Sequence, residues 1–429
     1  MQYDRGATKF WGFIKDPIYG YIRLSETEKN ILDAAPVQRL RRIKQLSGAE
    51  FVYPAANHTR FEHALGAMYL AGTLGQSLPI ELEAYDILCL RTAALLHDVG
   101  HTPFSHLFEP MMTALLEKTH EDLGSWIIEK SELSDVLQKE GLDSKRISKL
   151  AVGKLEEPKR AFMDQVIRSS VDVDKMDFVM RDSYHTGAGY GYVDVFRLIY
   201  TMDVLDGNLA VNATAVPTLE TFLLARLQSF RTIYFHRTSR AVQIMVLKAL
   251  EKAEPELNLL GFKTPEEYLE LDDYSVWAKL KQCTKSKQLI EDVEKRRLLK
   301  CCYDKTFYTK DELVSSIFAD DAVRRHMEEE IAVKAKVSQE EVWIDVPSLP
   351  SVPYHNAMQF EPMDIPVFQE ARGGEKISVR LTELSQIVEA LRVFMNIIRV
   401  YSTAKHRENV MKAAEDVLGK QTISTRVSY

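Results

Sequence analysis

The hydrophobic pattern of the chain changes character along its length. Aromatic and β-branched residues at 10–14 and 19–24 flank the turn sequence DPIYG, which predicts a β-hairpin. Ser25-Glu26-Thr27-Glu28 has the form of a capping box and predicts a short helix directly after it. From there to about residue 255, apolar residues recur at helical spacing, and the clearest predicted helices are 61–74, 83–96, 108–118, 123–130, 160–169, 173–181 and 218–254.

Beyond Pro255 the pattern mixes short helices with strand-like runs. Strands are predicted at 341–346, 365–369 and 378–381, around a proline-rich loop that contains Pro347, Pro350 and Pro353. The last two helices are predicted at 384–400 and 403–418. The chain should therefore be mainly α, with a helical domain and an N-terminal hairpin at 1–255. An α+β appendage at 256–429 carries no chemical motif and is a candidate oligomerisation region.

The composition is that of a folded globular protein. The 429 residues are 45% hydrophobic and 27% charged, which excludes disorder as the main state. The net charge is −7, which excludes a global basic field for nucleic acid and leaves a local basic patch at 39–44. The four cysteines form no CxxC pair, and the sequence shows no signal peptide and no apolar run of membrane-spanning length. We therefore expect a cytoplasmic protein that is not bound to a membrane.

Histidines are concentrated in one part of the predicted helical domain. Six of the eleven fall between residues 58 and 120. Histidine is a metal ligand and a proton donor near neutral pH, so this concentration indicates chemistry rather than packing. A lone histidine would usually be a structural residue, and we expect His58 and His185 to lie in loops or at the surface. The six clustered positions are His58, His63, His97, His101, His106 and His120.

The dipeptide His97-Asp98 is the sharpest element of this cluster. It ends an apolar helix and is followed by Gly100, so helix termination can turn both side chains toward one ion. An imidazole and a carboxylate suit Fe, Mn, Zn, Ni or Co, and with water molecules Mg. Two ligands are not enough, and His63 on the preceding helix with one downstream carboxylate would complete a set of four.

The downstream acids lie in the segment VDVDKMDFVMRD. On a helix Asp174 and Asp177 share one stripe, whereas Lys175 and Asp182 share another. Alone, such a run would be a solvated acidic face. Beside a histidine cluster it becomes a source of metal ligands, although the spacing does not choose among the acids.

Several blocks of sequence resemble the HD-domain metal-dependent phosphohydrolases. They are similar above all to the branch of deoxynucleoside triphosphate triphosphohydrolases that includes proteins with a SAM and an HD domain. We expect no SAM domain in this chain. The resemblance implies a helical HD-domain core and covers roughly residues 15–240 in the blocks DPIYGYIRL, VQRLRRIKQL, HTRFEHALG, LLHDVGHTPFSH, THED, VDVDKMDFVMRD and RTIYFHR.

The resemblance implies specific roles for the clustered side chains. The metal ligands of the family fall on His63, His97, Asp98 and Asp174. Histidines that line the path of the phosphates fall on His101, His106 and His120. His106 with Glu109 resembles the proton-donating pair of the family, in which the carboxylate orients the ring and supports its charged form.

The resemblance also implies a nucleotide pocket. Triphosphate contacts fall on Arg60, Lys175 and Arg226, contacts to the sugar 3′-hydroxyl on Gln45 and Asp182, and residues that crowd the 2′ position on Leu46 and Tyr234. Phe178 and Phe235 stand where better-known members carry tyrosine and glutamine. Each loses a polar group near the nucleotide, so base and sugar preference stay open.

A second nucleotide site is partly matched. Asp33, Gln38 and Arg41 fall on positions that bind an activating guanine nucleotide in the family. The alternative is that the basic segment 38–44 is a solvent-exposed face or a subunit contact. Gly12 replaces a lysine of that site, which leaves activation open.

The resemblance implies hydrolysis of a deoxynucleoside triphosphate at the α-phosphorus, which gives a deoxynucleoside and inorganic triphosphate. The cofactor would be a divalent transition metal (Mn, Fe, Ni, Co or Zn), with Mg accompanying the substrate, and the protein would form a homodimer or homotetramer. One alternative is an HD hydrolase of another phosphoester, such as a nucleoside monophosphate, a cyclic nucleotide or an alarmone. A second is a non-catalytic module that binds nucleotide or nucleic acid through the patch 39–44.

Overall fold

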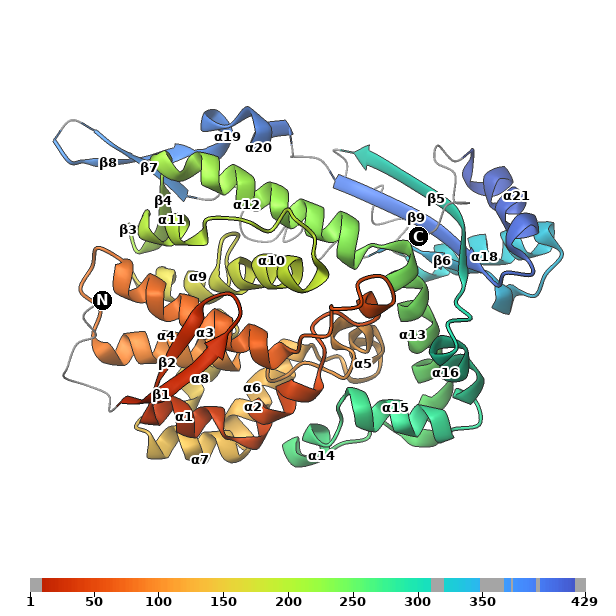
Figure 1. Cartoon of the computed structure of the whole chain (residues 1–429), viewed down its shortest axis with the longest axis horizontal. Coiled ribbons are helices and arrows are strands. Elements are labelled where there is room, and N and C mark those ends of the chain that lie inside the picture. Colours follow the sequence, from red (N-terminus) through yellow and green to blue (C-terminus); the bar gives the residue numbers. More distant parts are fainter. Residues whose placement is uncertain (1–9, 310–319, 348–365, 372, 391–393, 421–429) are drawn as a thin grey trace.

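The structure is a computed structural model that describes residues 10–309, 320–347, 366–371, 373–390 and 394–420. Most of the chain forms a helical body, and a smaller lobe with a sheet lies at one end of it (Figure 1). One large hydrophobic core runs through the body from Ile22 to Val388. The prediction of a mainly α protein with an N-terminal hairpin and C-terminal strands is confirmed.

The N-terminal hairpin forms where the turn sequence predicted it. Strands β1 (Phe10–Asp16) and β2 (Gly20–Ser25) pair antiparallel, with Ile14 opposite Ile22. Ser25 then caps helix α1 (Glu26–Leu32) through the predicted capping box, because its hydroxyl accepts from the Glu28 amide and the Glu28 carboxylate accepts from the Ser25 amide.

Helices α3 and α10 form the centre of the body and lie against each other (Figure 1). Gly66 of α3 permits this approach, because a Cβ there would collide with the side chains of Asp177 and Arg181 on α10. The helices of the body to this point are α2 (Ala35–Arg39), α3 (Arg60–Ser77), α4 (Ala84–Leu96), α5 (Glu109–Leu116), α6 (His120–Lys130), α7 (Glu132–Lys139), α8 (Ser144–Ala151), α9 (Ala161–Ile167), α10 (Val173–Thr186) and α11 (Val195–Tyr200), with short 3-10 turns at Leu40–Arg42, Ala49–Phe51 and Ser105–Leu107.

The prediction of one continuous helix at 218–254 is wrong. Helix α12 (Val216–Ser229) passes into a π-helical turn at Phe230–Tyr234, and α13 (Arg237–Leu257) begins in a new direction. The π-turn is closed by a hydrogen bond from the Phe235 amide to the Phe230 carbonyl. His236 then has an extended backbone and caps α13 with its ring nitrogen. No proline or glycine marks the break, so the hydrophobic pattern could not show it.

A four-stranded sheet lies beside α12. Its strands, in the order β3-β4-β7-β8, include a hairpin of β3 (Met202–Leu205) and β4 (Asn208–Asn212) that the sequence analysis missed. Strand β7 (Pro366–Glu370) pairs parallel to β4, and β8 (Lys376–Arg380) pairs antiparallel to β7. The strands predicted at 365–369 and 378–381 are therefore present within one or two residues, although residue 365 and most of the proline-rich loop lie outside the described residues.

The small lobe contains the sheet β5-β9-β6, with α18 (Asp321–Ala335) and α21 (Arg407–Leu418) beside it (Figure 1). Strand β6 (Trp343–Asp345) falls within a predicted strand, whereas β5 (Lys300–Thr309) was not predicted. The helix predicted at 384–400 is wrong, because its second half is strand β9 (Phe394–Ser402), which pairs with both β5 and β6. Two short helices, α19 (Leu381–Leu384) and α20 (Gln386–Ala390), precede it.

Three helices that follow α13 pack against the main body. They are α14 (Pro265–Leu269), α15 (Asp273–Gln282) and α16 (Lys287–Glu294). Their apolar side chains, such as Tyr268, Val276 and Ile290, join the large core. Across the described residues, the helices lack the combination of length and apolarity that a membrane span needs.

Candidate metal centre and active site

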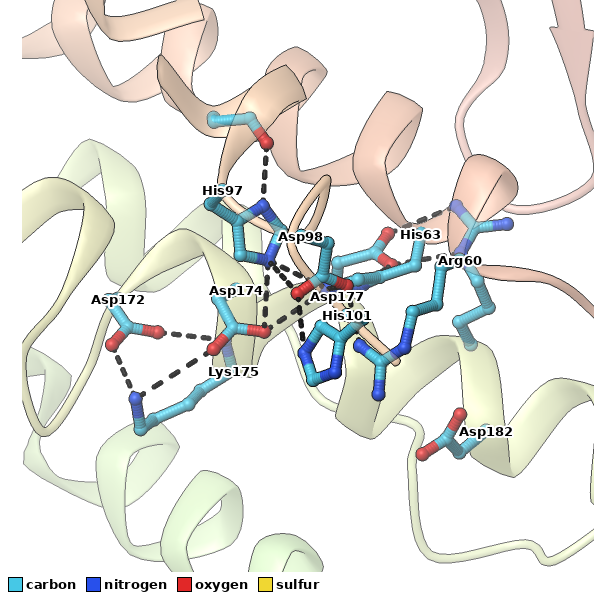
Figure 2. Close-up of polar contacts among 12 residues, drawn as sticks. Arg60, His63, His97, Asp98, His101, Asp172, Asp174, Lys175, Asp177 and Asp182 are labelled. Atoms are coloured by element: carbon cyan, nitrogen blue, oxygen red, sulfur yellow. Dashed lines mark hydrogen bonds and ion pairs between the residues drawn. The ribbon is translucent and has the colours of Figure 1, made fainter. Parts of the chain in front are cut away.

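Two histidine rings meet edge-on at the centre of the body. His63 on α3 and His97 at the C-terminus of α4 approach with their Nε2 atoms 3.2 Å apart (Figure 2). His63 Nδ1 donates to the Asp177 carboxylate at 2.8 Å, and His97 Nδ1 donates to the Ala94 carbonyl at 2.7 Å. Because both partners are acceptors, Nδ1 carries the proton in each neutral ring, and both Nε2 lone pairs point into the same space.

Asp174 supplies a carboxylate to this space from the first turn of α10. Its Oδ1 lies 3.1 Å from His63 Nε2 and 3.8 Å from His97 Nε2. Burial would raise the pKa of Asp174, but hydrogen bonds with the two histidines outweigh burial and hold it well below its usual range. Burial likewise would lower the pKa of His63, yet its bonds to Asp174 and Asp177 raise that pKa to about 10. The site strongly favours a positive charge between these groups.

Asp98, which directly follows His97 in the sequence, supplies a second carboxylate to the cluster of His63, His97 and Asp174. Its Oδ1 lies 3.3 Å from His97 Nε2 and 3.1 Å from His101 Nε2, and its Oδ2 lies 3.8 Å from His63 Nε2. The Arg60 guanidinium donates to Oδ2 at 2.6 Å. Burial raises the pKa of Asp98, but Arg60 and the neighbouring histidines lower it well below its usual range. Asp98 is therefore an ionised carboxylate that touches both histidines and a buried cation (Figure 2).

The donor set fits a divalent transition metal. The ligand atoms of His63, His97 and Asp174 all lie within 4.8 Å of one another. Ligands that bind one ion at about 2.0–2.1 Å lie about 3.0–3.4 Å apart, close to the distances seen here. The approach of the two Nε2 atoms to 3.2 Å requires a positive charge between them, either a shared proton or a metal ion. The set is nitrogen and carboxylate oxygen, as expected for Mn, Fe, Co, Ni or Zn.

A buried chain of ion pairs supports His63. Asp177 accepts from His63 and also pairs with Arg181 at 2.9 Å, and Arg181 pairs with Asp16 of the hairpin at 2.9 Å. Asp177 and Arg181 have no exposed surface. Sequence reasoning treated Asp177 only as an alternative ligand, whereas its carboxylate fixes the tautomer of His63. The position of Asp177 one helical turn after Asp174 was the sequence signal that could have indicated this role.

A second histidine cluster lies next to Asp98. The rings of His101 and His120 stack with centroids 4.1 Å apart, and His106 approaches both edge-on. Glu109 links two of them, because it accepts from His106 Nδ1 at 2.9 Å and from His120 Nδ1 at 2.5 Å. Gly100 makes the stacking feasible, since a Cβ there would collide with the backbone of α6 at His120.

Two of the three phosphate-contacting candidates, Arg60 and Lys175, contact residues of the first cluster. Arg60 is buried and donates to Ser105 as well as Asp98. Lys175 donates to the buried Asp172 at 2.5 Å and lies 4.0 Å from Asp174. Arg226 is buried near the end of α12, which packs against α10. Arg60 and Lys175 therefore place cationic groups directly beside the proposed ligands.

Two of the sugar-binding candidates, Asp182 and Tyr234, are in direct contact. The Asp182 carboxylate bonds to His58 Nε2 at 2.7 Å and accepts from the Tyr234 hydroxyl, which the π-turn carries to it. Gln45 lies next to His58 through a main-chain bond, and Leu46 packs in a small cluster with Ala49 and Ile233. His58 lies in a loop, as predicted, and its side chain is buried. The prediction of a loop or surface position is wrong for His185, because His185 lies in the last turn of α10, where it is half-buried and stacks on His58.

The two departures from the family occupy different places. Phe178 lies edge-on to Tyr234 with ring centroids 6.3 Å apart. Phe235 is buried against Phe230 and Ile397 of β9. Phe235 is therefore a packing residue that joins the body to the small lobe.

The candidates for a second nucleotide site lie on the surface around α2. Gln38 accepts from Arg41 at 2.9 Å, and the Arg41 guanidinium lies over the Phe61 ring at 3.5 Å. Asp33 pairs with Lys29 at 2.9 Å. Gln38 and Arg41 are thus in contact, whereas Asp33 has a separate partner.

Comparison with known proteins identifies two family regions in this chain. The HD domain family matches residues 60–179, and the HD associated region matches residues 193–428. An uncharacterized protein of Methanocaldococcus jannaschii is 29% identical over 80% of this chain and 70% of its own length. The deoxynucleoside triphosphate triphosphohydrolase SAMHD1 of Homo sapiens is 30% identical over 67% of this chain and 54% of its own length.

Two further relatives extend the comparison. The SAMHD1 homolog of Dictyostelium discoideum is 30% identical over 69% of this chain and 61% of its own length. The crystal structure of a hypothetical protein from Aquifex aeolicus superimposes with a TM-score of 0.73 at 26% identity, covering 94% of this chain and 99% of that one. The chain thus spans little more than half of the named triphosphohydrolases.

The matched HD region carries the residues described above. His63, His97, Asp98 and Asp174 all fall within residues 60–179, and the HD associated region contains α12, the π-turn and the small lobe. These matches and the histidine–aspartate cluster support a metal-dependent phosphohydrolase. The chain belongs to the HD-domain family and carries the HD associated region of that family.

Proposed function

We propose that this protein hydrolyses deoxynucleoside triphosphates to a deoxynucleoside and inorganic triphosphate. The observation that carries the proposal is the convergence of His63, His97 and Asp174 on one space beside two buried or half-buried cations, Arg60 and Lys175. The names of the human and Dictyostelium relatives support the same substrate class. A polyanionic tail explains this charge better than a single phosphate would.

The proposed metal ligands are His63, His97, Asp98 and Asp174. A divalent ion held there would neutralise phosphate charge and lower the pKa of a bound water molecule. Arg60 would donate to phosphate oxygens from a guanidinium that Asp98 and Ser105 already orient. Lys175 adds a point charge that Asp172 orients.

The proton transfer is assigned to His106. The oxygen of a water molecule forms a bond to the α-phosphorus as the water releases one proton to solvent, and the bond between that phosphorus and the 5′-oxygen breaks. The 5′-oxygen takes the Nε2 proton of His106, whose Nδ1–H is fixed by Glu109 at 2.9 Å. The His101 and His120 rings, stacked beside it, line the path of the phosphates.

The sugar is assigned to the Asp182 end of the site. Asp182 and Gln45 would bind the 3′-hydroxyl, while Leu46 and Tyr234 would crowd the 2′ position. Tyr234 is held by its bond to Asp182, so the ring has a fixed position. Phe178 beside Tyr234 offers no hydrogen bond to the nucleotide, and the base preference must come from other groups.

The test is a panel of dNTPs and NTPs assayed with Mn, Fe, Co, Ni, Zn and Mg. Chromatography of the products should show a deoxynucleoside and triphosphate in equal amounts. Release of monophosphate or phosphate alone would favour another phosphoester as the substrate. Nucleotide or single-stranded nucleic-acid binding without turnover in any metal would contradict the proposal.

A further inference from the structure

The loop that carries the catalytic histidines has a strained backbone. Phe104 and Ser105, directly before His106, both have a left-handed conformation, with φ of 58° and 57°. This conformation is disfavoured for residues with a Cβ, and two in succession persist only where the surroundings fix them. The segment 100–106, which we call the HD loop, therefore needs external support.

That support comes from a segment well outside the HD domain in sequence. The Tyr268 hydroxyl on α14 donates to the Gly100 carbonyl at 2.8 Å. Asp273 at the start of α15 accepts from the Phe104 amide at 2.7 Å through Oδ1. Both side chains are buried. Two main-chain groups of the HD loop are thus held from residues 268–273.

Arg39 joins the same contact from α2. Its Nη1 donates to the His101 carbonyl at 2.9 Å, and its Nε donates to the Leu271 carbonyl at 2.8 Å. The guanidinium also lies over the Tyr268 ring at 4.8 Å. Arg39 therefore bridges the HD loop to the segment between α14 and α15.

Asp273 holds a second partner that matters for the loop. Its Oδ2 accepts from the Lys44 amide at 2.9 Å. The Lys44 carbonyl in turn accepts from the Ser105 hydroxyl at 2.7 Å, and that hydroxyl accepts from Arg60 at 2.8 Å. The Asp273 carboxylate thereby fixes both the strained turn at Phe104 and the main chain at Lys44, which holds the Ser105 hydroxyl that orients Arg60.

We infer that Asp273, assisted by Tyr268 and Arg39, is a positioning residue for the reaction: it clamps the HD loop so that His101 and His106 are presented to the phosphates. The inference rests on the proposed function and extends it, because it gives the segment after α13 a part in catalysis. Asp273 touches none of the proposed metal ligands in the contacts described for it, so its effect should fall on turnover rather than on metal binding.

The test compares Asp273→Asn with the neighbouring variant Asp272→Asn. An asparagine keeps the shape of Asp273 but can accept from only one of the two amides and turns a donor toward the other. Asp272 also starts α15, where it accepts from the Ser275 amide and pairs with Arg42, but these contacts do not include the HD loop. Both substitutions therefore alter the start of α15, but only Asp273→Asn removes a hydrogen bond to the HD loop.

In Asp273→Asn, kcat should fall about 10–100-fold, as expected for a displaced catalytic group, with little change in KM or metal content. Hydrogen–deuterium exchange of the peptide 100–107 should speed up. Tyr268→Phe should show the same changes to a smaller degree, and Asp272→Asn should keep both turnover and exchange. If Asp273→Asn does not fold, Tyr268→Phe decides the matter with the same two measurements.

Equal losses of kcat in the Asp272 and Asp273 variants, or unchanged exchange of the HD loop in Asp273→Asn and Tyr268→Phe, would overturn the inference. Failure of the proposed function has a different signature. In that case the wild-type protein would release no triphosphate, while the exchange measurement would still report whether the clamp exists.

Discussion

His106 differs from the other two histidines of its cluster in exposure. Its side chain is 66% exposed, whereas those of His101 and His120 are 3% and 23% exposed. A proton donor must reach the leaving oxygen of a substrate that enters from solvent. His106, backed by Glu109, is therefore placed to donate, while His101 is held against Asp98.

His106→Ala should lose about 10²–10⁴-fold in turnover, the usual contribution of a general acid, and should keep its metal and its nucleotide affinity. Metal analysis, nucleotide binding and steady-state kinetics on the same preparation check this expectation. His326→Ala, at an exposed position on α18, is the matched control. Turnover in His106→Ala at the wild-type rate would remove the role assigned to it.

Glu109 should set the pH range of activity. Burial raises the pKa of Glu109, but hydrogen bonds from His106 and His120 outweigh burial and hold it well below its usual range. The carboxylate stays ionised at working pH and raises the pKa of His106, which desolvation and the charge of Arg60 nevertheless hold below its usual value. In Glu109→Gln the pKa of His106 should fall, so the alkaline limb of the kcat profile should move to lower pH. Glu121→Gln on α6 should leave the limb in place, and an unmoved limb in Glu109→Gln would exclude His106 as the acid.

At the scale of elements, close contacts between helices bring the proposed metal ligands together. Helix α3 brings His63, α4 ends at His97, and α10 begins just before Asp174. The approach of α3 to α10 depends on Gly66, where a Cβ would strike Asp177 and Arg181.

Gly66→Ala should therefore destabilise the fold by about 1–3 kcal/mol, a usual cost of overpacking, and should weaken metal binding because Asp177 must move from His63. Denaturant unfolding and metal titration measure the two effects. The control is Gly12→Ala on β1, where a Cβ would meet no atom within 4 Å. Unchanged metal affinity in Gly66→Ala would show that Asp177 does not orient His63.

The sequence predicts elements where one local signal dominates. The turn DPIYG and the capping box at Ser25 define the hairpin and α1, and regular apolar spacing defines α3 and α4. The break at Phe230–Tyr234 has no proline or glycine, so it depends on contacts with β9 that the pattern does not contain. The run FMNIIRVYS of β9 is rich in β-branched and aromatic residues, so its strand propensity was a local signal that the helical interpretation overlooked, and pairing with β5 and β6 makes it a strand.

The candidate site was likewise predictable only where a local sequence motif marks its residues. Family resemblance located His63, His97 and Asp174, and the structure brings their ligand atoms together. The family resemblance could not show that Asp177 orients His63 or that His58 supports Asp182. Those contacts join residues that are 114 and 124 positions apart in the sequence. Supporting side chains of this kind are defined by the tertiary structure, with no local motif of their own.

For the whole molecule, the proposed metal ties together segments that are distant in sequence. Its ligands come from α3, the end of α4 and α10, and they are backed by Asp16 of the hairpin through Arg181. An ion bound only by the folded protein stabilises it by mass action, by about 2.7 kcal/mol at 100 times its Kd.

Removal of the metal by a chelator should therefore lower the unfolding temperature, and addition of Mn²⁺ should restore it. Thermal unfolding followed by circular dichroism measures the change. Asp174→Ala should show no response to chelator or Mn²⁺, because it lacks a ligand. An equal response in Asp174→Ala would indicate that the stabilising ion binds elsewhere.

The most direct test of the central claim is an anomalous-scattering map from crystals of the protein grown with Mn²⁺. The account predicts one strong peak bounded by His63 Nε2, His97 Nε2 and Asp174 Oδ1, with Asp98 as the fourth ligand. A peak confined to the His101–His106–His120 cluster, or no peak between His63 and His97, would contradict it.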